Sequence, residues 1–234
     1  MQLPPEIDLR AAEVDDVFEL SPMQEGMLFH VLYEPSAGMY FQQIAAPIKG
    51  IDVEAFDKAW QILVDRQPVL RTSFHWKDLA EPVQVVHRHV SFAVEHLDWE
   101  NMPPLEQKHR LAEFMQQDRE RGFDLEKPPL LRVTLIKTSP ENFYFVRSHH
   151  HILMDGWSGS ILFRQLFKIY NTLRHRRAHG LPDSKPYRSY IDWLKRQDLS
   201  AAETYWRSHL EGFTAPTPLP EDHSGHRSLV RGGD

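Results

Sequence analysis

The sequence contains no cysteine. Disulfide bonds, thiolate catalysis and zinc–sulfur sites are therefore excluded for these 234 residues. A chain without disulfides suits a reducing compartment, and we expect a cytoplasmic protein. Histidine, by contrast, occurs 14 times.

Basic charge and long apolar runs are also scarce. The chain has 27 Lys and Arg against 33 Asp and Glu, a formal net charge of -6. Phosphate binding needs a basic face, so we expect no nucleic-acid partner. The mean hydropathy of -0.50 and the lack of a long uncharged apolar run predict no membrane-spanning helix. The acidic N-terminus also lacks the apolar region of a signal peptide.

Strand-like and helix-like patterns alternate along the chain, which favours an α/β sandwich with a mixed sheet. Helices are predicted over 21–31, 52–66, 105–121, 158–177, 187–196 and 201–211. Strands are predicted over 40–48, 69–76, 83–89, 92–97, 131–137 and 143–151, the last two as an antiparallel hairpin. We expect a linker over 1–16, a folded region over 17–213 and an irregular tail over 214–234.

Three consecutive histidines end the last predicted strand. His150 and His151 open a His-His-x-x-x-Asp-Gly pattern that closes with Asp155 and Gly156. Because side chains alternate along a strand, His149 and His151 should share one face and His150 the other. His150 and His151 therefore cannot both face one cavity directly.

The residues alone leave three interpretations of this pattern open. In the first, His151 faces a reaction channel and Asp155 anchors the turn that positions it. In the second, His149, His151 and Asp155 bind a metal ion, although no HExxH motif or carboxylate-rich partner lies nearby. In the third, the histidines are ordinary strand residues. We further expect Ser158 to cap the following helix and Trp157 to join the core.

Four segments in order match motifs of a known family. Residues 150–158 fit HHxxxDGWS, residues 20–30 fit the family's first motif, and residues 66–74 fit RHxxLRTxF with Gln67 in place of the histidine. Residues 187–219 resemble the segment that leads to the crossover between lobes. On these motifs the chain resembles the N-terminal half of condensation domains of nonribosomal peptide synthetases.

This resemblance implies a chloramphenicol-acetyltransferase-like fold, in which two similar lobes form a V around an active-site tunnel. The sequence stops after the first lobe. We therefore expect a single N-terminal lobe, a two-layer sandwich of a mixed sheet and packed helices. Such a chain would be a truncated or split protein that is inactive without the C-terminal lobe.

The resemblance also implies amide-bond formation in antibiotic biosynthesis. The amine of an acceptor aminoacyl thioester attacks a donor acyl or peptidyl thioester, and both substrates ride on the phosphopantetheine of carrier proteins. No cofactor or metal is bound directly. The implied partners are the donor and acceptor peptidyl carrier proteins, the C-terminal lobe and an adjacent adenylation domain.

Roles for individual residues follow from the resemblance. His151 would accept the amine proton or hydrogen-bond the reacting atoms, and His150 would support it. Gly156 would offer its N–H to the developing oxyanion, unless it serves turn geometry alone. Asp155 would brace the site by pairing with Arg66 or, as second choice, Arg71, so that Asp155→Ala folds poorly.

Three other functions remain open on the sequence. The same fold would suit an epimerisation domain, or an acyltransferase that uses coenzyme A. A non-catalytic docking platform for carrier proteins is the third. The Trp157-Ser158 pair after Asp-Gly is more typical of condensation.

Overall fold

The computed structural model describes residues 13–34 and 38–215, and the chain divides into two compact units. The first unit runs to Lys195 and the second begins at Arg196. In the second unit, Asp198 caps α6 (Leu199–His209), a helix with no buried residue. Most of the predicted tail and the first part of the predicted linker lie outside the described residues. The predicted domain boundaries therefore stay a prediction.

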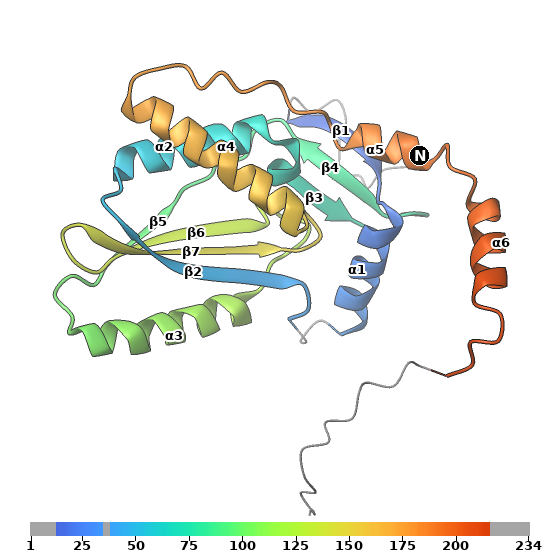
Figure 1. The fold of residues 1–234 in the computed structure, drawn as a ribbon, viewed down its shortest axis with the longest axis horizontal. Helices are drawn as coiled ribbons and strands as arrows, with labels where there is room; N and C mark the ends of the chain where they lie inside the picture. Colours follow the sequence, from blue (N-terminus) through green and yellow to red (C-terminus); the bar gives the residue numbers. More distant parts are fainter. Residues whose placement is uncertain (1–12, 35–37, 216–234) are drawn as a thin grey trace, which may run out of the picture. The chain divides into compact units, whose positions relative to one another are not determined.

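The elements of the first unit follow the predicted order closely (Figure 1). They are β1 (Val14–Glu19), α1 (Pro22–Tyr33), β2 (Phe41–Lys49), α2 (Val53–Arg66), the 3-10 turn η2 (Pro68–Arg71), β3 (Thr72–His75), β4 (Val83–His87), β5 (Glu95–Asp98), α3 (Pro104–Arg121), β6 (Leu131–Lys137), β7 (Asn142–His150), α4 (Gly156–Arg174) and α5 (Arg188–Leu194).

A four-stranded sheet in the order β2-β7-β6-β5 carries the histidine strand. β7 runs antiparallel to both neighbours, whereas β5 runs parallel to β6, so the predicted mixed sheet is confirmed. The predicted β6–β7 hairpin is also present, with Lys137 opposite Phe143. Because β7 is a central strand, its last residues are held on both sides by backbone hydrogen bonds.

Helices cover both faces of this sheet (Figure 1). On one face, Phe145 of β7 packs against Phe56 and Trp60 of α2. On the other, Val146 joins a cluster with Phe114 of α3. Side chains alternate along β7 and therefore pack into two separate apolar clusters, one on each face of the sheet. Helix α3 forms a layer in addition to the two-layer arrangement that we expected.

A second, three-stranded sheet has the order β1-β4-β3. The pairing of β3 with β4 matches the two strands predicted around a polar turn. β1 begins at Val14, inside the stretch that we expected to be linker, because Val17 buries its side chain against Val83 and Val85. Among the described residues, no helix has the length and apolar character needed to span a membrane.

Candidate active site

The end of β7 turns sharply into α4. The backbone N–H of His151 donates to the carbonyl of Tyr40 at 2.7 Å. The N–H groups of Leu153 and Met154 then donate back to the carbonyls of His150 and His151, each at 3.2 Å. The turn is therefore built from backbone hydrogen bonds, and it holds His151 immediately beyond the sheet.

The three histidines lie in different environments. His149 and His150 are each 5% exposed, and burial is the main cause that lowers their pKa values to about 3 and about 4. Both rings are therefore neutral near neutral pH. His150 uses its Nδ1 to accept the N–H of Ile152 at 3.2 Å. His151 is half-buried, and its buried Nδ1 has no hydrogen-bond partner.

His151 lines a hollow of about 690 Å³, which we call the histidine pocket. Its walls come from the start of α1, η2, the turn after β7, the first half of α4 and the loop before α5. Residues that line it include Gln24, Gln67, His151, Met154, Gln165 and Tyr187. His149 and His150 do not line it, in agreement with the prediction that only one of the two motif histidines can serve a cavity directly.

Gln24 ties the first helix to the histidine turn. Its side-chain oxygen accepts the N–H of Ser21 at 3.0 Å, which completes the predicted capping box of α1. Its amide nitrogen donates to the carbonyl of Ile152 at 3.2 Å. From the sequence, we assigned Gln24 to helix capping alone. Its bond to the histidine turn was not predicted, because the partner lies 128 residues away.

A second buried amide supports the opposite wall. The side-chain nitrogen of Gln67 donates to Gln165 at 2.6 Å and to Ser184 at 2.7 Å. Gln67 thereby joins η2, α4 and the loop before α5 around the pocket. The sequence showed that Gln67 replaces the usual histidine of this motif. It did not predict that Gln67 would connect these three segments.

Asp155 does not form the ion pair that we expected. Its carboxylate accepts the N–H of Ser158 at 2.8 Å, and Asp155 is the N-cap of α4. This bond is the main cause that lowers its pKa. The side chain is exposed, so Asp155 can cap the helix without a buried cation. The prediction that Ser158 is the cap was wrong, since Ser158 supplies the N–H that the cap receives.

The two candidate partners of Asp155 bind elsewhere, so the expected pairing was wrong. Arg66 donates to the carbonyls of Leu181 and Pro182, at 3.2 and 2.8 Å. It therefore fixes the loop that leads to Ser184 and the pocket wall.

Arg71 lies at the edge of the other sheet. Its guanidinium donates to the carbonyls of Val64, His87 and Arg88 and forms an ion pair with Asp15 at 3.2 Å. This arginine joins β1, β4 and η2.

The two residues after Asp155 lie exposed at the start of α4. Trp157 is 83% exposed rather than part of the core, because the first turn of α4 turns this position away from the sheet. Gly156 is the first residue of α4, and a Cβ there would meet nothing within 4 Å. Its backbone is outside the left-handed region, so turn geometry does not require a glycine.

The metal interpretation requires several histidine or acidic side chains that lie close together. Within residues 13–34 and 38–215, no group of three or more histidine or acidic side chains is positioned to hold an ion.

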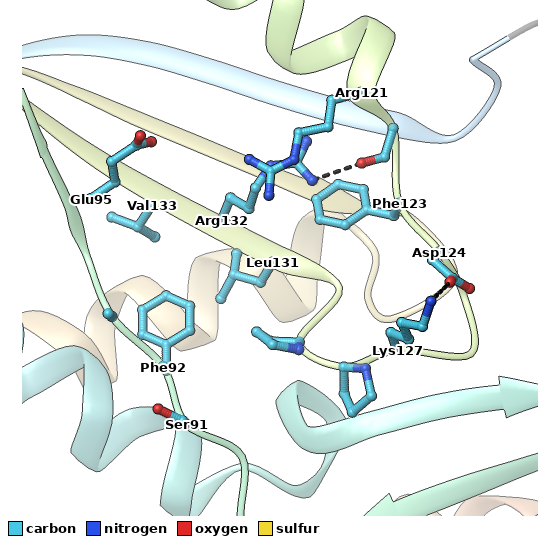
Figure 2. Close-up of a pocket in the computed structure, with 14 residues that line it drawn as sticks. Ser91, Phe92, Glu95, Arg121, Phe123, Asp124, Lys127, Leu131, Arg132 and Val133 are labelled. Atoms are coloured by element: carbon cyan, nitrogen blue, oxygen red, sulfur yellow. Dashed lines mark hydrogen bonds and ion pairs between the residues drawn. The ribbon is translucent and has the colours of Figure 1, made fainter.

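A second hollow, of about 590 Å³, contains none of the predicted site residues (Figure 2). We call it the α3 pocket, since it lies between the end of α3, the loop after it, the start of β6 and the segment before β5. Arg132 donates to the carbonyl of Gly122 at 2.7 Å and pairs with Asp118 at the same distance. Lys127 pairs with Asp124 at 2.8 Å.

Comparison with known proteins identifies the family. The family model for the condensation domain matches residues 14–232 of the sequence. The chain belongs to the condensation domain family. It is 48% identical over 228 residues to a linear gramicidin synthase of Brevibacillus parabrevis, and 39% identical over 212 residues to a plipastatin synthase of Bacillus subtilis. These matches cover 93% and 89% of this chain but 4% and 8% of the relatives.

Solved structures agree on the fold. The starter condensation domain of rhizomide synthetase RzmA superposes with a TM-score of 0.72 at 21% identity, over 83% of this chain and 50% of that one. The EpoB cyclization-docking bidomain from Sorangium cellulosum gives 0.72 at 22% identity, over 90% and 43%. This condensation domain chain therefore spans about half of each of these structures and corresponds to the N-terminal lobe.

Proposed function

We propose that the chain is the lobe of a nonribosomal peptide synthetase condensation domain that presents His151 to two thioesters. An acceptor aminoacyl group and a donor acyl or peptidyl group, each on the phosphopantetheine of a carrier protein, meet at the histidine pocket. The acceptor amine attacks the donor carbonyl, the carrier thiol leaves, and an amide forms. The observation that carries this proposal is His151 at the wall of a pocket of about 690 Å³.

His151 contributes by hydrogen bonding and proton acceptance. Its Nδ1 is buried, so Nε2 is the ring nitrogen left to meet a substrate. An α-amine titrates near ~8, so part of it is already neutral at neutral pH, and a thioester is already activated. Holding the reactants in line then supplies much of the rate. Proton acceptance by His151 adds a factor of about 10²–10⁴.

The neighbouring residues support His151 in different ways. Gly156 leaves its N–H at the free N-terminus of α4, where it can donate to the oxyanion of the tetrahedral intermediate. His150 stays neutral and fixes the turn through Ile152. Asp155 acts as the helix cap, and Arg66 acts through the loop of the pocket wall.

The second half of the fold would close the histidine pocket. The chain spans about half of the related solved structures, so the C-terminal lobe is the first partner that we propose. The donor and acceptor carrier proteins and an adjacent adenylation domain complete the assembly, in the cytoplasm.

Reconstitution tests the proposal. Donor- and acceptor-loaded carrier proteins are incubated with the chain, with and without a supplied C-terminal lobe, and dipeptidyl thioester is measured by mass spectrometry. Product is expected only with both lobes, and His151→Ala should abolish most of it. His109→Ala removes an exposed histidine of α3 and is the matched control that keeps activity.

Other outcomes would replace the proposal. Transfer from an acyl-coenzyme A to a small amine would indicate an acyltransferase of another kind. Racemised carrier-bound residues without amide product would indicate epimerisation. Carrier binding without turnover, in the presence of both lobes, would indicate a docking platform.

A further inference from the structure

A third hollow, of about 200 Å³, adjoins the histidine pocket, and we call it the side pocket. It lies between the sheet of β1, β3 and β4 and the start of α5. Pro68, Val69 and Tyr187 line both hollows, so the two adjoin along these residues. The hydroxyl of Tyr187 donates to Ser21 at 3.3 Å, which holds the tyrosine at this junction.

The side pocket has a largely apolar lining. Phe18 of β1 is 3% exposed and Val86 of β4 is 5% exposed, and both line it. Pro186 and the three shared residues add further apolar surface. Val86 lines the side pocket and not the histidine pocket, so a change at this position acts on the side pocket alone.

The polar side chains on the sheet side of this pocket already have partners. The hydroxyl of Thr72 donates to the carbonyl of Pro68 at 2.9 Å. The side-chain nitrogen of Gln84 donates to the carbonyl of Glu19 at 3.0 Å. A polar ligand group would have to compete with these bonds, whereas an apolar group needs none of them.

The charged side chains of the side pocket are paired as well. Asp16 pairs with Arg188 at 2.9 Å. Asp15 pairs with Arg71 and with Arg88, each at 3.2 Å. The charges are therefore balanced by one another, and the chemistry of the pocket favours an uncharged, apolar occupant.

The volume sets the size of that occupant. An apolar cavity of about 150 Å³ holds one benzene ring. The side pocket, at about 200 Å³, therefore has room for an aliphatic side chain such as that of leucine, or for a single aromatic ring.

The acceptor substrate supplies a side chain at the right end of the molecule. Its α-carbon is bonded directly to the amine nitrogen that meets His151, whereas the α-carbon of the donor lies beyond the reacting carbonyl. Every aminoacyl acceptor other than glycyl also carries a side chain there, which an acyl donor need not. Resting on the proposed function, we infer that the side pocket binds the side chain of the acceptor and selects uncharged, apolar amino acids.

Competition between acceptors tests the inference. The reconstituted two-lobe domain receives one donor and leucyl-, alanyl- or asparaginyl-loaded acceptor carriers, and kcat/KM is measured for each. Leucyl should exceed alanyl by about tenfold or more, because an apolar pocket discriminates by the carbons that it buries. Asparagine has nearly the shape of leucine, but its amide would lack a partner, so asparaginyl should react no faster than alanyl.

Variants assign the selectivity to the side pocket. Val86→Phe places a ring in it, so the leucyl value should fall about tenfold, to the alanyl value, while the alanyl value stays unchanged. Ala93→Phe adds the same ring to the α3 pocket and should leave both values unchanged. If Val86→Phe does not fold, Val86→Ala decides, because a larger pocket should shift the preference from leucyl to tryptophanyl.

Binding of toluene to the full chain gives a measurement that needs no catalysis. Toluene is apolar and has no group that requires a hydrogen bond. At a concentration near its solubility it should raise the melting temperature by about 2 °C, and Val86→Phe should abolish the shift.

Several results would overturn the inference. They are equal kcat/KM values for the three acceptors, a selectivity that survives both Val86 variants, and a melting temperature that toluene does not change. A Val86→Phe effect that follows the side chain of the donor would assign the pocket to the other substrate. No amide from any acceptor would refute the proposed function, and with it the acceptor as occupant, even if toluene binds.

Discussion

The histidine pocket and the α3 pocket are similar in size, about 690 and 590 Å³, and differ in what their polar groups do. In the α3 pocket, the carboxylate of Asp118 pairs with Arg132. The carboxylate of Asp124 pairs with Lys127 (Figure 2). In the histidine pocket, amide side chains bind one another, and His151 is left to the cavity. Size alone therefore does not distinguish the two pockets, whereas the unpaired ring nitrogen of His151 does.

Replacing His151 gives the largest expected contrast between the pockets. His151→Ala should lower the rate of amide formation about 10²–10⁴-fold in the reconstituted domain, because the proton acceptor is lost. Its melting temperature should stay within error of the parent. Lys127→Met, in the α3 pocket, should keep the parent's rate. Equal rates for the two variants would erase the functional difference between the pockets.

Breaking the Arg132 pair should cost stability rather than activity. Arg132→Met leaves the buried carboxylate of Asp118 without its cation, and such losses are roughly 3 kcal/mol. Urea denaturation measures the change in the free energy of unfolding. A rate loss with no loss of stability would contradict the structural role assigned to this pocket.

Acid should weaken the fold through the buried histidines. An unfolded histidine binds a proton near pH ~6.5, whereas burial lowers the pKa of folded His150 to about 4. The unfolded state therefore binds the proton first, and stability present at higher pH is lost as the pH falls from about 6.5 to about 4. His150 alone should account for roughly 3 kcal/mol.

Denaturation at about pH 7.5 and about pH 4.5 measures this acid effect. His150→Asn, whose side-chain oxygen can replace Nδ1 as the acceptor for Ile152, should reduce the difference between the two pH values. His109→Asn, on the exposed surface of α3, should leave it unchanged. An equal acid response of the two variants would contradict a depressed pKa at His150.

Removing the cap of α4 should have the smallest effect. Asp155→Ala loses the bond to Ser158 and should cost about 1 kcal/mol, far less than a buried ion pair would. Asp155→Asn can still accept that N–H and should restore most of the loss. A melting curve of each variant suffices, and a grossly unfolded Asp155→Ala would bring back the ion-pair hypothesis.

Local pattern predicted most of the fold. The predicted alternation agrees with the structure in that His151 lines the histidine pocket and His150 does not. The Ser21–Gln24 box correctly begins α1. Both features depend on neighbours within a few residues. The partner of Asp155 could not be found this way, since family resemblance names residues without giving distances. Trp157 was assigned to the core from its apolar ring, but the helix phase of α4 points it outward.

The Gln24–Ile152 bond has a consequence for how the molecule assembles. It closes a chain separation of 128 residues, whereas the β6–β7 hairpin closes within a few. Contacts between distant segments carry a larger loop-closure entropy and lower the folding rate. The hairpin that contains the histidine strand can therefore pair early in folding, and the turn after it is fixed later, when the first helix docks on it.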